Sequence, residues 1–228
     1  MPRTGTTRAP YLTMLVGLLA VALALIVADW AHRNGYAAVS GWRWDTNRDA
    51  SWIELYRGTL LIISAVLLAR LGRSAPGAPV LLAWALLLVV VALDDNLALH
   101  ERGGGWLDST VGLPTPVGLT GQDVGELVVW GALGALLAAL VVLGHRRSSA
   151  PARAVSRHLA LALGLVVFFA VVVDMVHAAV VSEVPYRVDY LLTAVEAAGE
   201  TGAVAVLTVV CVHRARAGLP TREVARAA

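Results

Sequence analysis

The sequence predicts an all-α fold, a six-helix transmembrane bundle with the N- and C-termini on the cytoplasmic side. Three observations support this prediction. Of the 228 residues, 58% are hydrophobic and 15% are charged, whereas soluble domains average about 45–50% and 25%. The mean hydropathy is +0.72. The apolar residues form six long runs, and arginine is distributed unevenly among the segments that connect these runs.

Each of the six runs is long enough to cross the roughly 30 Å hydrocarbon core of a bilayer. They cover residues 11–31, 53–71, 78–100, 122–145, 157–182 and 189–213. We expect the first run to be a retained helix and not a signal peptide, because it is long and Asp29-Trp30-Ala31 is a poor cleavage site. The runs are expected to form one transmembrane domain over residues 1–213, followed by a disordered basic tail over 214–228.

The basic residues, all of them arginine, predict the orientation. With the N-terminus inside, twelve lie in cytoplasmic segments: Arg3, Arg8, Arg70, Arg73, Arg146, Arg147, Arg153, Arg157, Arg214, Arg216, Arg222 and Arg226. Six lie outside: Arg33, Arg43, Arg48, Arg57, Arg102 and Arg187. This asymmetry follows the positive-inside rule for a multi-pass protein, here of a bacterial plasma membrane. The basic balance therefore indicates no nucleic-acid partner. A single cysteine, Cys211, excludes an internal disulfide.

Two outer connections are long, over residues 32–52 and over the Gly- and Pro-rich stretch 102–121, and we expect both to be loops. Asp29 and His32 lie three residues apart at the outer end of the first run. We expect these two side chains to lie in the headgroup region, and therefore the substitution Asp29→Asn to leave stability unchanged.

Ionisable residues inside the spans indicate where a functional site lies. Each is unfavourable in hydrocarbon unless its charge is neutralised or paired. At 1.5 Å per residue, the acids of four spans lie roughly 6 to 16 Å below the outer boundary. The charge count near this layer includes seven acids: Asp94, Asp95, Glu101, Glu126, Asp174, Glu196 and Glu200. Arg57 is the one arginine within reach. Either several acids are neutral, or cations lie among them.

A divalent metal ion satisfies both the geometry and the charge, because carboxylates and imidazoles are ligands for Zn, Fe or Mn. Asp174-x-x-His177 has the spacing of the Glu-x-x-His element found in dinuclear carboxylate-bridged bundles. The second such element is missing. The predicted ligands are His100, Glu101, Glu126, Asp174, His177, Glu196 and Glu200. Asp94, Glu126 and Arg57 are predicted to serve catalysis by orienting ligands or substrate. On a continuous helix, Asp95 and His100 point away from Asp94.

Two motifs resemble known groups of membrane proteins. Leu93-Asp94-Asp95 followed by His100-Glu101 resembles the L-D-[DE]-x4-H-E motif of uncharacterised bacterial polytopic membrane proteins, which also share a late E-x3-E pair, here Glu196 and Glu200. This resemblance implies that the acids act as a unit, and it implies no activity. Trp52-Ile53-Glu54-Leu55-Tyr56 more faintly resembles the W-E-x-x-Y element of integral-membrane terpene cyclases, with a spacing that departs by one residue.

Three functions fit these observations. The first is a metal-dependent membrane enzyme that hydrolyses or oxidises a lipid or other apolar substrate, prenylated substrates included. The second is a carrier of divalent cations or protons, although the spans hold almost no ionisable residue on the inner side of Glu200. The third is a terpene cyclase started by a protonated carboxyl group. A purely structural role for internal ion pairs is the remaining alternative. The sequence predicts no oligomeric state.

Overall fold

The structure, a computed structural model, describes residues 9–116 and 118–219, and this part of the chain is helical without strands. The elements are α1 (Ala9–Arg33), η1 (Ala37–Val39), η2 (Trp42–Trp44), α2 (Trp52–Ser74), α3 (Pro79–Leu97), α4 (Leu99–Val111), α5 (Gly121–Arg146), α6 (Ala150–Val167), η3 (Phe168–Val173), α7 (Asp174–Val180) and α8 (Tyr186–Ala217). Arg3, Arg8 and most of the predicted basic tail lie outside the described residues.

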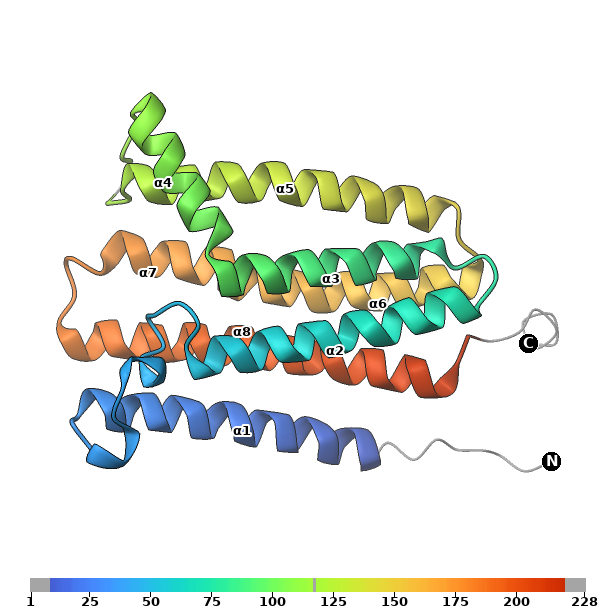
Figure 1. The fold of residues 1–228 in the computed structure, drawn as a ribbon, viewed down its shortest axis with the longest axis horizontal. Helices are drawn as coiled ribbons and strands as arrows, with labels where there is room; N and C mark the ends of the chain where they lie inside the picture. The colour runs from blue at the N-terminus through green and yellow to red at the C-terminus, as the bar shows by residue number, and fades with distance from the viewer. Residues whose placement is uncertain (1–8, 117, 220–228) are drawn as a thin grey trace.

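Six helical segments are long and apolar enough to cross a membrane, which confirms the predicted number of spans. Five of them are the single helices α1, α2, α3, α5 and α8, and the sixth is the continuous segment Ala150–Val180, formed by α6, η3 and α7. Figure 1 shows these segments running side by side along the long axis of the molecule. The protein is therefore a multi-pass helical bundle of the integral membrane type.

The fifth span begins at Ala150, not at residue 157 as predicted. Its first turn holds Pro151, a residue that tolerates this position because it has no backbone N–H to leave unpaired. The sequence did not predict this start, because the charges of Arg153 and Arg157 interrupt the apolar run.

The third span is shorter than predicted, because α3 ends at Leu97 and a new helix begins at Leu99. Between them Ala98 has φ 48° and ψ 44°, a left-handed conformation that ends a helix. The expectation of a continuous helix over 78–100 is therefore wrong. The expectation of a loop over 102–121 is also wrong in its first half, where α4 continues to Val111. In Figure 1, α4 leaves the bundle at an angle beside the start of α5.

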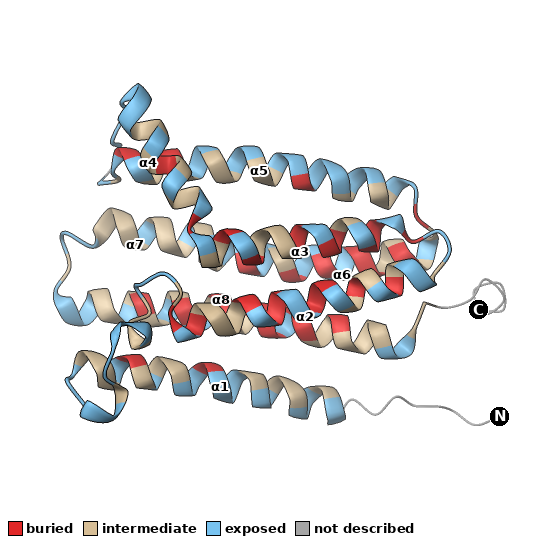
Figure 2. Ribbon diagram, in the orientation of Figure 1, coloured by how far each residue is buried: buried red, intermediate tan, exposed pale blue. Residues whose placement is uncertain are grey.

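The core lies where α2, α3, α6 and α8 meet. Its largest fully buried side chains include Leu61, Leu68, Leu88, Leu159 and Leu207. Figure 2 shows that buried residues are concentrated on these central helices, whereas α1 and α5 expose most of their surface. Because the exposed side chains of α1 and α5 are mainly apolar, these two helices present the surface expected for contact with lipid.

Two glycines let α4 cross closely over α5. A Cβ atom on Gly104 would lie 2.6 Å from the backbone nitrogen of Glu126, and a Cβ atom on Gly125 would overlap the backbone of Gly104. Close approach of helix backbones is the usual role of small residues in membrane bundles. This contact fixes the position of α4 over the end of the bundle where α5 and α8 begin, which we call the α4 end.

Asp29 is buried within the protein, with only 1% of its surface exposed. Its carboxylate accepts hydrogen bonds from Nε of Arg33 at 3.0 and 3.1 Å and from the backbone nitrogen of Thr46 at 3.0 Å. Nη2 of Arg33 also reaches Asp45 at 3.0 Å. Asp29 thus ties the connection between α1 and α2 to the end of α1.

We therefore reverse the expectation for Asp29→Asn, which should lower the free energy of unfolding by about 2 kcal/mol, because a buried charge-assisted hydrogen bond is lost. Thermal unfolding in a mild detergent measures this loss. Asp49→Asn, the same substitution at an exposed position of the same connection, is the matched control. Equal melting temperatures for the two variants would contradict the role of Asp29.

Candidate functional site

The titratable residues predicted from the sequence meet at the α4 end in three separate groups. The first, the Arg57 cluster, consists of Arg57, Asp95 and Glu200. The second, the His177 cluster, consists of His177, Asp189 and Glu196. The third, the His100 cavity, is a small hollow that His100, Glu126 and Asp174 line together.

The Arg57 cluster joins α2, α3 and α8. Nε and Nη2 of Arg57 donate to the two carboxylate oxygens of Asp95 at 3.0 and 2.8 Å, and Nη1 donates to Oε2 of Glu200. The neighbouring Gly58 allows α3 to approach, since a Cβ atom there would overlap the side chain of Asn96. All three charged side chains are largely buried, and each carboxylate has a cationic partner.

The His177 cluster joins α7 to α8. Nδ1 of His177 lies 3.1 Å from Oε2 of Glu196, and Nε2 lies 2.9 Å from Oδ1 of Asp189. A carboxylate accepts hydrogen bonds, so the doubly protonated imidazolium is the form of His177 that satisfies both contacts. In this arrangement neither ring nitrogen of His177 is available to a metal ion.

His100 has a different environment, because only one of its nitrogens faces a carboxylate. Nδ1 lies 2.7 Å from Oδ2 of Asp94, a residue that is 1% exposed. Oδ1 of Asp94 is buried and has no hydrogen-bond partner among the described residues. The contact exists because the helix ends at Ala98, which turns α4 back so that His100 meets Asp94 across the break.

The His100 cavity has a volume of about 30 Å³, enough for at least one water molecule. Three elements contribute its polar lining: α4 through His100, α5 through Glu126 and α7 through Asp174. The remaining lining is apolar and consists of Leu127, Trp130, Ala170, Val171 and Met175. The centroids of the His100 and Trp130 rings are 5.8 Å apart.

The carboxylates around His100 favour a positive charge at this position. Burial lowers the pKa of His100, but the hydrogen bond to Asp94 and nearby negative charges such as that of Glu126 outweigh burial and raise it. The pKa of the adjacent Glu101 carboxyl group is also raised, because burial and the charge of Asp49 disfavour its ionised form. The negative charges of Asp94 and Glu126 therefore act on the imidazole that lines the cavity.

The seven predicted ligands do not surround one common centre. Among residues 9–116 and 118–219, no three His, Cys, Asp or Glu side chains converge closely enough to hold a metal ion as they stand. Glu126 accepts a hydrogen bond from Nε2 of Gln122 at 2.9 Å, and Glu200 is paired with Arg57. The structure instead brings together three of the predicted ligands, which are His100, Glu126 and Asp174.

Two carboxylates that form ion pairs within the site were not among the predicted metal ligands. Asp95 pairs with Arg57, and Asp189 pairs with His177. The sequence contains a signal for Asp189, because it continues the stripe of Glu196 along one helix face. It contains none for the contact of Asp94 with His100, because alanine at position 98 is not a typical helix-ending residue.

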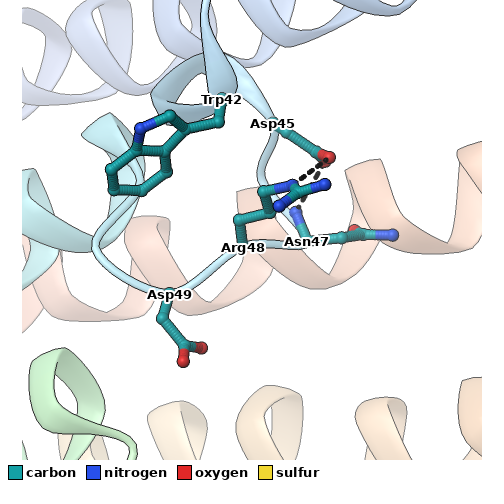
Figure 3. Close-up of a pocket in the computed structure, with 5 residues that line it drawn as sticks. All are labelled: Trp42, Asp45, Asn47, Arg48 and Asp49. Carbon is teal, nitrogen blue, oxygen red and sulfur yellow. Dashed lines mark hydrogen bonds and ion pairs between the residues drawn. The ribbon is translucent and has the colours of Figure 1, made fainter.

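A second hollow lies in the connection between α1 and α2, lined by Trp42, Asp45, Asn47, Arg48 and Asp49. Figure 3 shows that Asp45 faces Arg48, whereas the Asp49 carboxylate points away from them. Asp45 is already paired with Arg33 at 3.0 Å and with Arg48 at 3.5 Å. The side chains therefore do not converge on a common ligand position.

The chain matches one family model, "Domain of unknown function (DUF8692)", over residues 9–215. Because the match covers most of the chain, the protein belongs to this family. Comparisons with curated proteins and with solved structures give no match.

Proposed function

We propose that this protein is a membrane enzyme that holds a divalent metal ion in the His100 cavity and acts on a lipid or other apolar substrate. The observation that carries the proposal is the position of His100, whose Nδ1 faces Asp94 while its ring lines a cavity shared with Glu126 and Asp174. In the proposed centre, His100, Glu126 and Asp174 are the ligands and Asp94 orients His100.

The donor set fits a metal ion of the Zn, Fe or Mn type, since one imidazole and two carboxylates suit these ions. A histidine that binds a metal through one nitrogen commonly donates its other N–H to a carboxylate, and Asp94 is placed to accept it. Among the described residues, Oδ1 of Asp94 has no hydrogen-bond partner, so the negative charge of this carboxylate acts mainly on the imidazole of His100. Binding requires Glu126 to rotate away from Gln122, because the three side chains do not converge as they stand.

When bound, such a metal ion supplies Lewis acidity and activates water for hydrolysis or, if it is iron, oxygen for oxidation. The protein's own groups prepare the site. Asp94 fixes the tautomer and the orientation of the His100 ring. Arg57 pairs with both Asp95 and Glu200, and the His177 cluster holds α7, which carries Asp174, against α8. The apolar walls limit access of water to the cavity.

A cation or proton carrier would need polar groups that continue from the Arg57 cluster through the bundle, away from the α4 end. The groups found there give little support to this alternative. The hydroxyl groups of Ser64 and Thr208 lie deeper in the bundle, and both bond to backbone carbonyls of their own helices. Hydroxyl groups engaged in this way do not form a chain of ionisable sites across the membrane. The proposed enzyme therefore needs no path through the bundle, only access to its α4 end.

We further propose that the α4 end faces the outside of a bacterial plasma membrane and that both termini are cytoplasmic. This orientation rests on the excess of arginine in the connections at the opposite end, where Arg146, Arg147 and Arg153 lie. A reporter active only in the cytoplasm, fused to the C-terminus, should be active. An inactive reporter together with an active periplasmic reporter would reverse the assignment.

Elemental analysis tests the metal proposal. Protein purified in mild detergent without chelator should contain about one equivalent of Zn, Fe or Mn, and the double variant Glu126→Gln/Asp174→Asn should lose it. The matched control is Asp49→Asn/Glu183→Gln, which neutralises two exposed acids and should keep the metal. A wild-type protein that stays free of metal after incubation with each ion would contradict the proposal.

A further inference from the structure

We propose that the hydrocarbon chain of a membrane lipid lies in the gap between α5 and the η3–α7 segment, so that its polar end reaches the His100 cavity sideways from the bilayer. The part of this inference that places the polar end of the lipid at the metal site rests on the proposed function. It adds the class of substrate, an amphiphile with a long apolar chain, and the surface that binds this chain.

The first argument is the composition of the cavity walls. Leu127 and Trp130 come from α5, Ala170 and Val171 come from η3, and Met175 comes from α7. α5 packs closely against α3 and α4, but its contact with η3 and α7 is marginal. Figure 1 shows α5 running beside α7 without crossing it. The two walls of the cavity therefore belong to helices that do not pack tightly against each other.

The second argument is the surface on which the gap opens. Side chains next to its walls point away from the bundle and are apolar, with Val128, Val172 and Val176 exposed by 52%, 48% and 55%. In a membrane-spanning segment such side chains meet lipid tails. An apolar gap between them is filled by hydrocarbon in preference to water, because water has no polar partners there.

The third argument is size. At about 30 Å³ the cavity has room for an ion or a water molecule and none for a chain. The chain must therefore lie along the gap, outside the cavity, with only its terminal polar group at His100, Glu126 and Asp174. This arrangement keeps the apolar part of the substrate in the bilayer during binding.

The fourth argument is that η3 is anchored on α8. η3 is a six-residue π-helix, a form that is rare and often found at functional sites. The ring of Phe169 packs directly on Gly199 of α8, where a Cβ atom would overlap it. This contact holds η3 on α8 and leaves the face with Ala170 and Val171 towards the gap.

Photolabelling tests the inference. Protein in nanodiscs is illuminated with a photoreactive fatty-acid probe or, in a second arm, with a photoreactive farnesyl probe, and labelled peptides are identified by mass spectrometry. Peptides that contain Leu127 or Val171 should be labelled in the wild type. Ala170→Trp should fill the gap and reduce this labelling at least fivefold, while Val172→Trp, which places the same indole ring at an exposed neighbouring position, should not. The arm with the stronger labelling identifies the chain as acyl or prenyl.

Leu127→Trp on the opposite wall provides a second filling variant in case Ala170→Trp does not fold, which size-exclusion chromatography shows. Equal labelling of the wild type and of both folded filling variants would overturn the inference. Metal content is measured on the same samples. A wild type that is labelled in the gap and contains no metal would refute the metal centre alone, whereas a metal-containing protein without specific labelling would refute the lipid site alone.

Discussion

Arg57→Met should lower the free energy of unfolding by about 3–5 kcal/mol, the range found when one partner of a buried ion pair is removed. Asp95 and Glu200 would lose their shared cationic partner while the surrounding helices kept them away from water. Thermal and denaturant unfolding in bicelles measure the loss. Met has a similar length to the arginine stem and leaves little empty volume, so the effect reports on charge.

A compensating variant separates lost charge pairing from lost packing. Arg57→Met combined with Asp95→Asn and Glu200→Gln removes the three charges together and should recover most of the stability. This recovery is expected because neutralising a whole buried cluster is far less unfavourable than breaking it. A single variant as stable as the wild type would show that the two acids do not depend on Arg57.

Gly125→Ala should both destabilise the protein and abolish metal binding. The added Cβ atom would overlap the backbone of Gly104, which cannot rotate out of the way as a side chain can. Overpacking of this kind typically lowers stability by about 1–3 kcal/mol. Moving α4 away from α5 would also separate His100 from Glu126, so metal stoichiometry should fall well below that of the wild type.

Gly131→Ala on the same helix is the matched control. A Cβ atom at Gly131 would meet nothing within 4 Å, and alanine favours a helix over glycine by up to about 1 kcal/mol. The control should therefore be as stable as the wild type or more stable, with unchanged metal content. If Gly125→Ala behaved like Gly131→Ala, the close crossing of α4 and α5 would be wrong.

The number and approximate position of the spans were predictable from the sequence because each depends on a long apolar run, a local property. The collection of acids in one layer was predictable for the same reason, since depth follows from residue count along a helix. The break at Ala98 was not predictable. Alanine is the best helix former, and only tertiary contacts hold it in a left-handed conformation.

The pairing of the acids depended on contacts that sequence spacing does not contain. Helix periodicity correctly groups Glu196 with Glu200 on one face, yet Glu196 contacts His177 and Glu200 contacts Arg57. Which neighbour each acid meets depends on how α2 and α7 pack around α8, and packing is a property of the whole bundle. Likewise, the spacing of Asp29 and His32 did not reveal that Arg33 and Thr46 bury Asp29.

The most direct test of the central claim is X-ray absorption spectroscopy at the metal edge of the zinc-loaded protein. We predict one ion per chain with a single imidazole and oxygen ligands, at distances of about 2.0–2.2 Å. The imidazole signal should disappear in His100→Ala and persist in His177→Ala. A spectrum with two imidazoles, or one without any imidazole, would contradict a centre built on His100, Glu126 and Asp174.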